Sequence, residues 1–246
     1  GTGSAHPEAE TTELPRDPRR LPPTPTPASI DPEAIEAGQR IADRYVVRGI
    51  VGRGGMGVVF RVQDELLGEE VALKVFHRAG AKERDVERFK DEMRICRRLA
   101  HPNIVRVFEF GAWAGNHFIT MELLTGSDLD QMLRAQRGPL PLPMSLPLMI
   151  QACDGLGAAH KEGVLHRDIK PGNLFVLDEG RTLKVMDFGI TKAQRVEGSL
   201  TATGTLVGSP AYIAPERLRG DGGDGVAADL YALGVVMYQM LAGQLP

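Results

Sequence analysis

The order of local sequence patterns is the feature that most constrains the fold of this chain. Segments rich in β-branched and aromatic residues come first, interrupted by one segment of helical periodicity. After Gly126 the pattern changes to longer segments with helical spacing. An order of strands followed by helices is typical of an α+β fold. We therefore expect a strand-rich first part that carries one helix, and a mainly helical second part.

Five strands and one helix are expected in the first part. β-Branched residues are enriched in the five candidate strands, at residues 45–51, 58–60, 71–76, 105–110 and 117–121. In residues 85–99 apolar side chains recur at helical spacing between charged ones, which indicates one amphipathic helix. The second part is expected to contain helices at residues 128–136, 146–162 and 229–241. It also contains a proline-rich turn at 139–147 and short strands at 174–177 and 182–186.

Residues 1–38 differ in composition from the rest of the chain. They carry eight prolines among Thr, Glu and Ala residues, with few apolar side chains that a core could bury. Such a segment is expected to stay extended or disordered. Thr24 and Thr26 each precede a proline, so this arm is either a docking or phosphoacceptor element or a simple spacer. The folded region is expected to comprise residues 41–124 and 125–246.

Charge and composition exclude several classes of protein. The net charge of −3 over 246 residues gives no electrostatic reason to expect a nucleic-acid partner. Cys96 and Cys153 lie far apart within apolar helical patterns, so neither a disulfide framework nor a metal knuckle is indicated. No apolar run approaches the roughly 18 residues that a membrane span needs, and no signal peptide is evident. A cytoplasmic location, with no membrane segment in this chain, is therefore expected.

A glycine-rich segment between two expected strands is the first candidate for phosphate binding. It runs Gly52-Arg-Gly54-Gly-Met-Gly57-Val-Val59, and its glycines permit a tight hairpin whose backbone amides approach phosphate oxygens. A flexible hairpin turn is the alternative interpretation. A dinucleotide-binding loop would need a helix to open at the third glycine, whereas the strand pattern continues after Gly57. The sequence therefore favours a lid over phosphates.

Lys74 is the second candidate, because it stands in an otherwise apolar strand. An ammonium group is costly to bury unless an anion meets it. Glu92, on the expected amphipathic helix, is one candidate partner, and ATP phosphates are the other. The alternative is a lysine whose side chain extends to solvent.

Two further clusters combine polar groups suited to phosphoryl transfer. The first is His166-Arg-Asp168-Ile-Lys170-Pro-Gly-Asn173. Asp168 can accept a proton from an attacking hydroxyl, Lys170 can neutralise charge on the transferred group, and Asn173 can offer an oxygen to a divalent metal. A polar loop with a helix-capping aspartate is the alternative. The second cluster is Asp187-Phe-Gly, whose carboxylate suits a Mg²⁺ ion that bridges phosphates.

The four motifs together resemble those of protein kinases in order and spacing. The form Gly-x-Gly-Gly-Met-Gly at residues 52–57 is similar to that of the bacterial Hanks-type, or eukaryotic-like, serine/threonine kinases. The resemblance implies a two-lobed α+β fold: an N-lobe with a five-stranded antiparallel sheet and one helix αC, and a mainly helical C-lobe. It also implies binding of ATP with Mg²⁺ or Mn²⁺, and transfer of the γ-phosphoryl group to protein Ser/Thr hydroxyls. Lys170, two residues after Asp168, resembles the serine/threonine class.

The resemblance also implies a nucleotide site. Met121 is similar to the gatekeeper and Glu122 to Leu124 to the hinge, whose backbone would bond adenine. The residues implied to bind the nucleotide are Val51, Gly52, Gly54, Gly57, Val59, Ala72, Lys74, Met121, Glu122, Leu124 and Phe175. For Val59 and Ala72, ordinary strand packing is an alternative that is compatible with this role.

Residues 187–216 resemble an activation segment that ends in Ala-Pro-Glu216. A phosphate added there could form charge-assisted bonds with Arg167, so we expect autophosphorylation of Thr201 or Thr203 to regulate activity. Ser209 stands where the family usually has threonine and retains the hydroxyl. A homodimer for autophosphorylation is a further expectation.

Asp229 resembles the buried helix aspartate that braces the backbone around His-Arg-Asp in kinases. The family continues beyond the position of Pro246 with further helices, one of which supplies an arginine partner for Glu216. A C-lobe without its last helices, and a parent protein anchored to the inner membrane by a later helix, are therefore expectations. A truncated or non-catalytic nucleotide-binding scaffold is the alternative to an active kinase.

Overall fold

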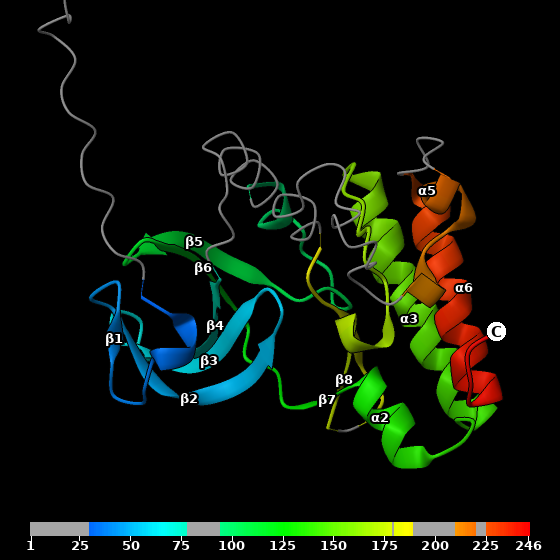
Figure 1. Cartoon of the computed structure of the whole chain (residues 1–246), viewed down its shortest axis with the longest axis horizontal. Helices are drawn as coiled ribbons and strands as arrows, with labels where there is room; N and C mark the ends of the chain where they lie inside the picture. Colours follow the sequence, from blue (N-terminus) through cyan, green and yellow to red (C-terminus); the bar gives the residue numbers. More distant parts are fainter. Residues whose placement is uncertain (1–29, 78–93, 179, 189–209, 220–224) are drawn as a thin grey trace, which may run out of the picture.

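The computed structural model describes residues 30–77, 94–178, 180–188, 210–219 and 225–246. An antiparallel sheet forms one side of the molecule and a group of helices forms the other (Figure 1). This arrangement agrees with the predicted order of strands and then helices. Within the described residues, no helix is long and apolar enough to cross a membrane.

The N-lobe sheet has six antiparallel strands in the order β1-β2-β3-β4-β6-β5. Its strands are β1 (Arg40–Ile41), β2 (Tyr45–Gly54), β3 (Gly57–Asp64), β4 (Glu69–Phe76), β5 (Val107–Trp113) and β6 (Asn116–Met121). The five predicted strands are present, and the two-residue strand β1 is added at the edge through its pairing with β2. Residues 94–96 of the predicted amphipathic helix are helical, and its remaining N-terminal part, with Glu92, lies outside the described residues.

The folded region begins earlier than the proline content of residues 1–38 predicts. Residues 30–38 form a segment that includes the 3-10 turn η1 (Pro32–Ala34), whose cap is the side chain of Asp31. Ile35 is 3% exposed and packs against the sheet. The Gly38 amide donates to the Val47 carbonyl at 2.8 Å. Buried apolar side chains, backbone bonds and side-chain contacts therefore hold a segment that composition alone assigns to the arm.

Two helices begin the C-lobe. Helix α2 (Leu129–Gln136) starts one residue after the predicted 128, because Asp128 is its cap and its carboxylate accepts from the Gln131 amide at 2.8 Å. Helix α3 (Leu142–Lys161) begins four residues before the predicted start at 146, within the expected proline-rich turn. Proline is tolerated in the first turn of a helix because its missing N–H has no partner there. Pro147 lies inside α3 and removes only one helical bond, and Leu148 and Met149 beside it are buried.

A small antiparallel sheet and a second long helix complete the C-lobe. The sheet contains β7 (Gly126–Asp128), β8 (Leu174–Leu177) and β9 (Leu183–Val185), with the 3-10 turn η2 (Pro171–Asn173) directly before β8. The 3-10 turn η3 (Pro210–Tyr212) and helix α5 (Pro215–Arg219) precede helix α6 (Val226–Ala242). Helix α6 begins before the predicted residue 229 and ends at Gly243, which has a φ of 73°.

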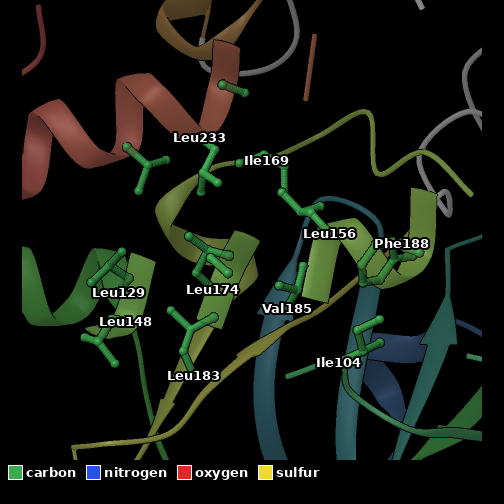
Figure 2. Packing of buried hydrophobic residues seen from close by; sticks show 14 of the residues in the cluster. Ile104, Leu129, Leu148, Leu156, Ile169, Leu174, Leu183, Val185, Phe188 and Leu233 are labelled. Atoms are coloured by element: carbon green, nitrogen blue, oxygen red, sulfur yellow. The ribbon is translucent and has the colours of Figure 1, made fainter. Parts of the chain in front are cut away.

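Buried side chains form three clusters. The first cluster joins α2, α3, β8, β9 and α6 with five residues of the N-lobe, namely Phe76, Cys96, Leu99, Ile104 and Ile119. Figure 2 shows Leu129, Leu148, Leu174 and Leu183 in one part of it and Phe188 near Leu156 in another. The outer core includes Ile35, Val47, Val58, Phe60 and Phe118. The cleft cluster comprises Ala72, Val105 and Met121, with Val59, Leu123, Leu124 and Met186 packed against them. The sheet therefore has apolar side chains on both faces.

The segment between residues 101 and 106 joins the two lobes. The amide of Val105 donates to the Val185 carbonyl at 3.0 Å, and the Val185 amide donates to the Asn103 carbonyl at 2.8 Å. The buried side chain of Asn103 also donates to the Leu183 carbonyl at 2.8 Å. These bonds fix β9 against the N-lobe, and Asp187 follows β9 by two residues.

Candidate active site

The glycine-rich segment forms the predicted hairpin between β2 and β3. Gly54 pairs with Gly57 at its end, and the His77 amide donates to the Met56 carbonyl at 3.0 Å. Gly57 has a φ of 157°, and a β-carbon there would lie 2.1 Å from the Val75 carbonyl oxygen. Only glycine fits at this position. The space around Gly52 and Gly54 is open, because a β-carbon at either position would meet no neighbouring atom within 4 Å.

The cleft cluster contains four of the residues that the resemblance implies to bind the nucleotide, namely Val59, Ala72, Met121 and Leu124. Ala72 pairs directly with Met121 across β4 and β6, and Val59 packs against them. Leu124, from the expected hinge, packs against the same cluster. Val51, which is exposed on β2, and Phe175, on β8, are not part of this cluster within the described residues.

Three apolar members of the cleft cluster are absent from the predicted site. They are Val105, Leu123 and Met186. Met186 comes one residue before Asp187, and Leu123 lies inside the expected hinge. Their closeness to these motifs in the sequence is the signal that could have assigned Met186 and Leu123 to the site.

Lys74 and Asp187 form a close ion pair. The Nζ atom of Lys74 lies 2.7 Å from Oδ2 of Asp187, and Lys74 is only 6% exposed. Burial raises the pKa of Asp187, but the positive charge and hydrogen bond of Lys74 and the charge of Lys170 outweigh this effect and leave the pKa below its ordinary value. The carboxylate is therefore held ionised beside two lysines.

Asp168, Lys170 and Asn173 lie in direct contact with one another. Lys170 Nζ is 2.8 Å from Asp168 Oδ2. The side-chain nitrogen Nδ2 of Asn173 donates to the backbone carbonyl oxygen of Asp168 at 2.7 Å and to the side-chain Oδ2 of Asp168 at 3.2 Å. The η2 turn positions Asn173 for both contacts. This arrangement fixes the orientation of the Asp168 carboxylate and leaves Oδ1 of Asn173 as the atom of that side chain able to bind a metal.

Asp229 braces the backbone before Asp168. It is 2% exposed at the start of α6, and its carboxylate accepts from the amides of His166 at 2.8 Å and Arg167 at 2.7 Å. The Nε2 atom of His160 donates to the same carboxylate at 2.8 Å. Arg167 has a φ of 67°, a conformation that a non-glycine residue rarely adopts, and these bonds hold it. His160, on α3, was not predicted from the sequence.

His166 is fully buried and held in one tautomer. Its Nε2 donates to the Met186 carbonyl at 2.6 Å, and its Nδ1 accepts from the Asp168 amide at 3.3 Å. Burial lowers the pKa of His166, and the nearby Asp229 only partly opposes that shift. The ring also lies against Phe188, with centroids 4.8 Å apart. The neutral imidazole thus joins the loop that carries Asp168 to the strand end that precedes Asp187.

The hinge is held by a contact that sequence patterns do not reveal. The Glu122 carboxylate accepts from the Arg106 amide at 2.8 Å and from Lys184 Nζ at 2.8 Å. The Glu122 amide in turn donates to the Arg106 carbonyl at 3.0 Å. Lys184 lies on β9, so Glu122 links the hinge to the strand that leads to Asp187.

The predicted regulatory residues Thr201, Thr203 and Ser209 lie outside the described residues. The backbone of Arg167 contacts the end of the segment, since Arg217 Nη1 donates to the Arg167 carbonyl at 2.8 Å. Arg217 follows Glu216 on α5 and was not predicted as a site residue.

The donor set at this site fits a hard divalent cation. Asp187 offers an ionised carboxylate and Asn173 an amide oxygen, and Mg²⁺ prefers oxygen ligands with substrate phosphates or water completing its coordination. No group of three or more His, Cys, Asp and Glu side chains that could hold a metal ion is found in the part of the chain that the structure describes. Two protein ligands suit a metal that arrives with a nucleotide.

Comparison with known proteins gives a consistent result. A family model described as "Protein kinase domain" matches residues 45–246. The chain is 41% identical over 214 residues to the "DNA damage-responsive serine/threonine-protein kinase RqkA" of Deinococcus radiodurans. The aligned region covers 86% of this chain and 32% of that protein. It is 42% identical over 217 residues to the "Serine/threonine-protein kinase pkn3" of Myxococcus xanthus, covering 85% of this chain and 39% of that protein.

A solved structure is also similar. The crystal structure of the Mycobacterium tuberculosis PknI kinase domain matches with a TM-score of 0.72 and 31% sequence identity, over 87% of this chain and 79% of that chain. The chain spans roughly a third of the length of the two curated relatives described above, at 32% and 39%.

Proposed function

Because this chain belongs to the protein kinase family, and within it to the bacterial Hanks-type serine/threonine kinases, we propose that it transfers the γ-phosphoryl group of Mg-ATP to serine and threonine hydroxyls of proteins. The observation that supports this proposal most is the pairing of Lys74 with Asp187 beside the contact group of Asp168, Lys170 and Asn173. The family uses ATP and a divalent metal; the choice of Mg²⁺ over Mn²⁺ is part of the proposal.

The nucleotide is proposed to lie between the two lobes. Adenine contacts the cleft cluster and the hinge backbone at Glu122 and Leu124, while the hairpin at Gly52, Gly54 and Gly57 covers the phosphates. Lys74 then binds phosphate oxygens with its ammonium group, which Asp187 already holds in the cleft. Apolar contacts and fixed charges thus orient the γ-phosphoryl group.

The acceptor hydroxyl is proposed to meet Asp168. Its carboxylate orients the hydroxyl and accepts the proton as the new P–O bond forms. Lys170, which contacts the same carboxylate, stabilises negative charge on the transferred group. Asp187 and Asn173 would hold the metal, which when bound neutralises charge on the phosphates. Positioning and charge stabilisation by these side chains account for the catalysis.

Phosphoamino-acid analysis after reaction with [γ-³²P]ATP tests the acceptor class. The substrate is a peptide library with equal Ser, Thr and Tyr content. We expect label on serine and threonine and little on tyrosine, because Lys170 occupies the position that is typical of serine/threonine kinases. Label mainly on tyrosine would contradict the acceptor assignment. Nucleotide binding without any transfer would instead favour the non-catalytic scaffold.

Regulation is proposed to act through the segment between Asp187 and Glu216. Phosphate on Thr201 or Thr203 would pair with the Arg167 guanidinium and order the segment beside Asp168. We also propose that two copies of the chain form a homodimer for this autophosphorylation, and that the protein is cytoplasmic. Mass spectrometry of active protein tests the first point, and a fully active protein with an unmodified segment would contradict it.

A further inference from the structure

The N-terminal segment, residues 30–38, makes a charged contact with the glycine-rich hairpin. Glu33 Oε2 accepts a hydrogen bond of 2.7 Å from Arg53 Nε. Arg53 lies between Gly52 and Gly54 of the proposed phosphate lid. His77, at the end of β4, has its Nε2 3.9 Å from the other Glu33 oxygen and contributes a charge only when protonated. One carboxylate therefore joins the N-terminal segment to the lid.

This contact lies on the side of the sheet away from the cleft. Arg53 pairs with Val58 in the β2–β3 ladder, whereas Gly52 pairs with Val59. Val58 belongs to the outer core and Val59 to the cleft cluster. Directly paired residues share a face of a sheet, and successive residues alternate between faces. The position of Arg53 therefore belongs to the outer face, with Glu33.

The N-terminal segment is itself fastened to the sheet on both sides of Glu33. Before Glu33, the Ile30 amide donates to the Ala114 carbonyl at 3.2 Å, and the Asn116 side chain donates to the Ile30 carbonyl at 2.6 Å. After Glu33, the buried side chain of Ile35 lies in the outer core. The segment that carries Glu33 is thus attached to the sheet both before and after this residue.

We propose that Glu33 is a positioning residue that limits how far the hairpin closes over bound nucleotide. A tether on the outer face resists motion toward the opposite face, where the phosphates bind in the proposed function on which this inference rests. Loss of the tether allows fuller closure and tighter nucleotide binding. The side chains of Glu33 and Arg53 are 41% and 58% exposed, so the effect on the dissociation constant is modest, roughly two- to fivefold.

Isothermal titration calorimetry with Mg-ADP tests the proposal on the wild-type chain, Glu33→Gln, Arg53→Gln and the double variant. The tether predicts that each single variant lowers the dissociation constant roughly two- to fivefold, and that the double variant binds no tighter than either one. A through-space field predicts opposite signs, because loss of the Glu33 anion favours phosphate binding and loss of the Arg53 cation opposes it. The sign of the Arg53→Gln effect therefore separates the two causes.

A matched control uses another exposed ion pair on the same sheet. Glu65→Gln breaks the Arg40–Glu65 pair, whose side chains are 51% and 42% exposed, and should leave the dissociation constant unchanged. The fluorescence of Trp113, the single tryptophan of the chain, which packs against the outer core near Ile30, reports whether the N-terminal segment stays in place. It should be unchanged in every variant.

Four results would overturn the proposal. Weaker binding by Arg53→Gln would assign the effect to the field, and unchanged binding by both single variants would remove the tether. Tighter binding accompanied by a shift in Trp113 fluorescence would assign the effect to a displaced segment. Failure of the wild-type chain to bind Mg-ADP would overturn the proposed function itself, and with it this inference, and is recognised without any variant.

Discussion

Lys74 on β4 and Asp187 after β9 are 113 residues apart in sequence, yet their Nζ and Oδ2 atoms lie 2.7 Å apart. The sequence predicts that the buried ammonium needs an anion, and it names Glu92 and ATP phosphates as partners. The described partner is Asp187, and Glu92 lies outside the described residues. The pair brings the lysine proposed to bind phosphate and the proposed metal ligand together.

Lys74→Met should abolish most of the phosphoryl transfer. The change removes the cation proposed to bind phosphate oxygens and leaves the Asp187 carboxylate without its partner, so we expect a rate loss of about 100- to 1000-fold. Single-turnover transfer from [γ-³²P]ATP measures it. Lys161→Met, an exposed position at the end of α3, is the control. Transfer within tenfold of wild type in Lys74→Met would contradict the proposed role.

Asp229→Asn should destabilise the C-lobe. Asparagine replaces one of the two accepting oxygens with an NH₂ group, which is a donor and faces the His160 ring or a backbone amide. Because two donors then face each other, we expect a loss of about 3 kcal/mol in the free energy of unfolding. Urea denaturation measures the loss. Asp178→Asn, at an exposed aspartate, should stay within about 0.5 kcal/mol of wild type. Equal stability of the two variants would show that the brace contributes nothing.

His166 should make the stability of the fold sensitive to mild acid. Its pKa is lower in the folded chain than its ordinary 6.5, so the unfolded state binds more protons as the pH falls below 6.5. The contribution of His166 to the free energy of unfolding is therefore fully present above pH 6.5. It is lost as the pH falls below 6.5, by at most about 1.4 kcal/mol per pH unit.

Urea denaturation between pH 5 and 7 measures this dependence. His166→Phe keeps a ring against Phe188 but removes the titrating group, so its profile should be flatter than that of wild type, although its stability at pH 7 is lower. Parallel profiles for the two proteins would exclude His166 as the source. Asp187, whose pKa is also lowered, adds a loss of the same sign only below about pH 4.

Lys184→Met should weaken nucleotide binding through the hinge. The variant loses the bond to Glu122, whose carboxylate then retains only the Arg106 amide. We expect KM for ATP to rise roughly three- to tenfold while kcat changes little. Steady-state kinetics at saturating peptide measure both constants, with Lys161→Met again as control. A fall in kcat at unchanged KM would place Lys184 in catalysis and contradict a hinge role.

The sequence predicted what local patterns and motif spacing determine. β-Branched enrichment in the strands, the helix predicted at residues 128–136 and the glycine-rich hairpin are local features, and the spacing of Asp168, Lys170 and Asn173 places them within one loop. The start of α3 was predicted too late, because proline in a first turn looks like a turn signal but costs little there.

Long-range contacts between ordinary residues left no comparable signal. Glu122 and Lys184, and Glu33 and Arg53, are charged residues in segments where solvent exposure is the expected outcome. Their pairing follows from how β9 and the N-terminal segment pack against the sheet, which depends on the whole fold. The same applies to His160, whose bond to Asp229 joins α3 to α6.

The most direct test of phosphoryl transfer by this site compares the wild-type chain with Asp168→Asn. The amide keeps the shape of the side chain and its contact with Asn173 but cannot accept the proton of the attacking hydroxyl. We expect single-turnover transfer from [γ-³²P]ATP to fall by about 100-fold or more, while the dissociation constant for Mg-ATP stays within about twofold of wild type. Equal phosphate incorporation by the two chains would contradict the account.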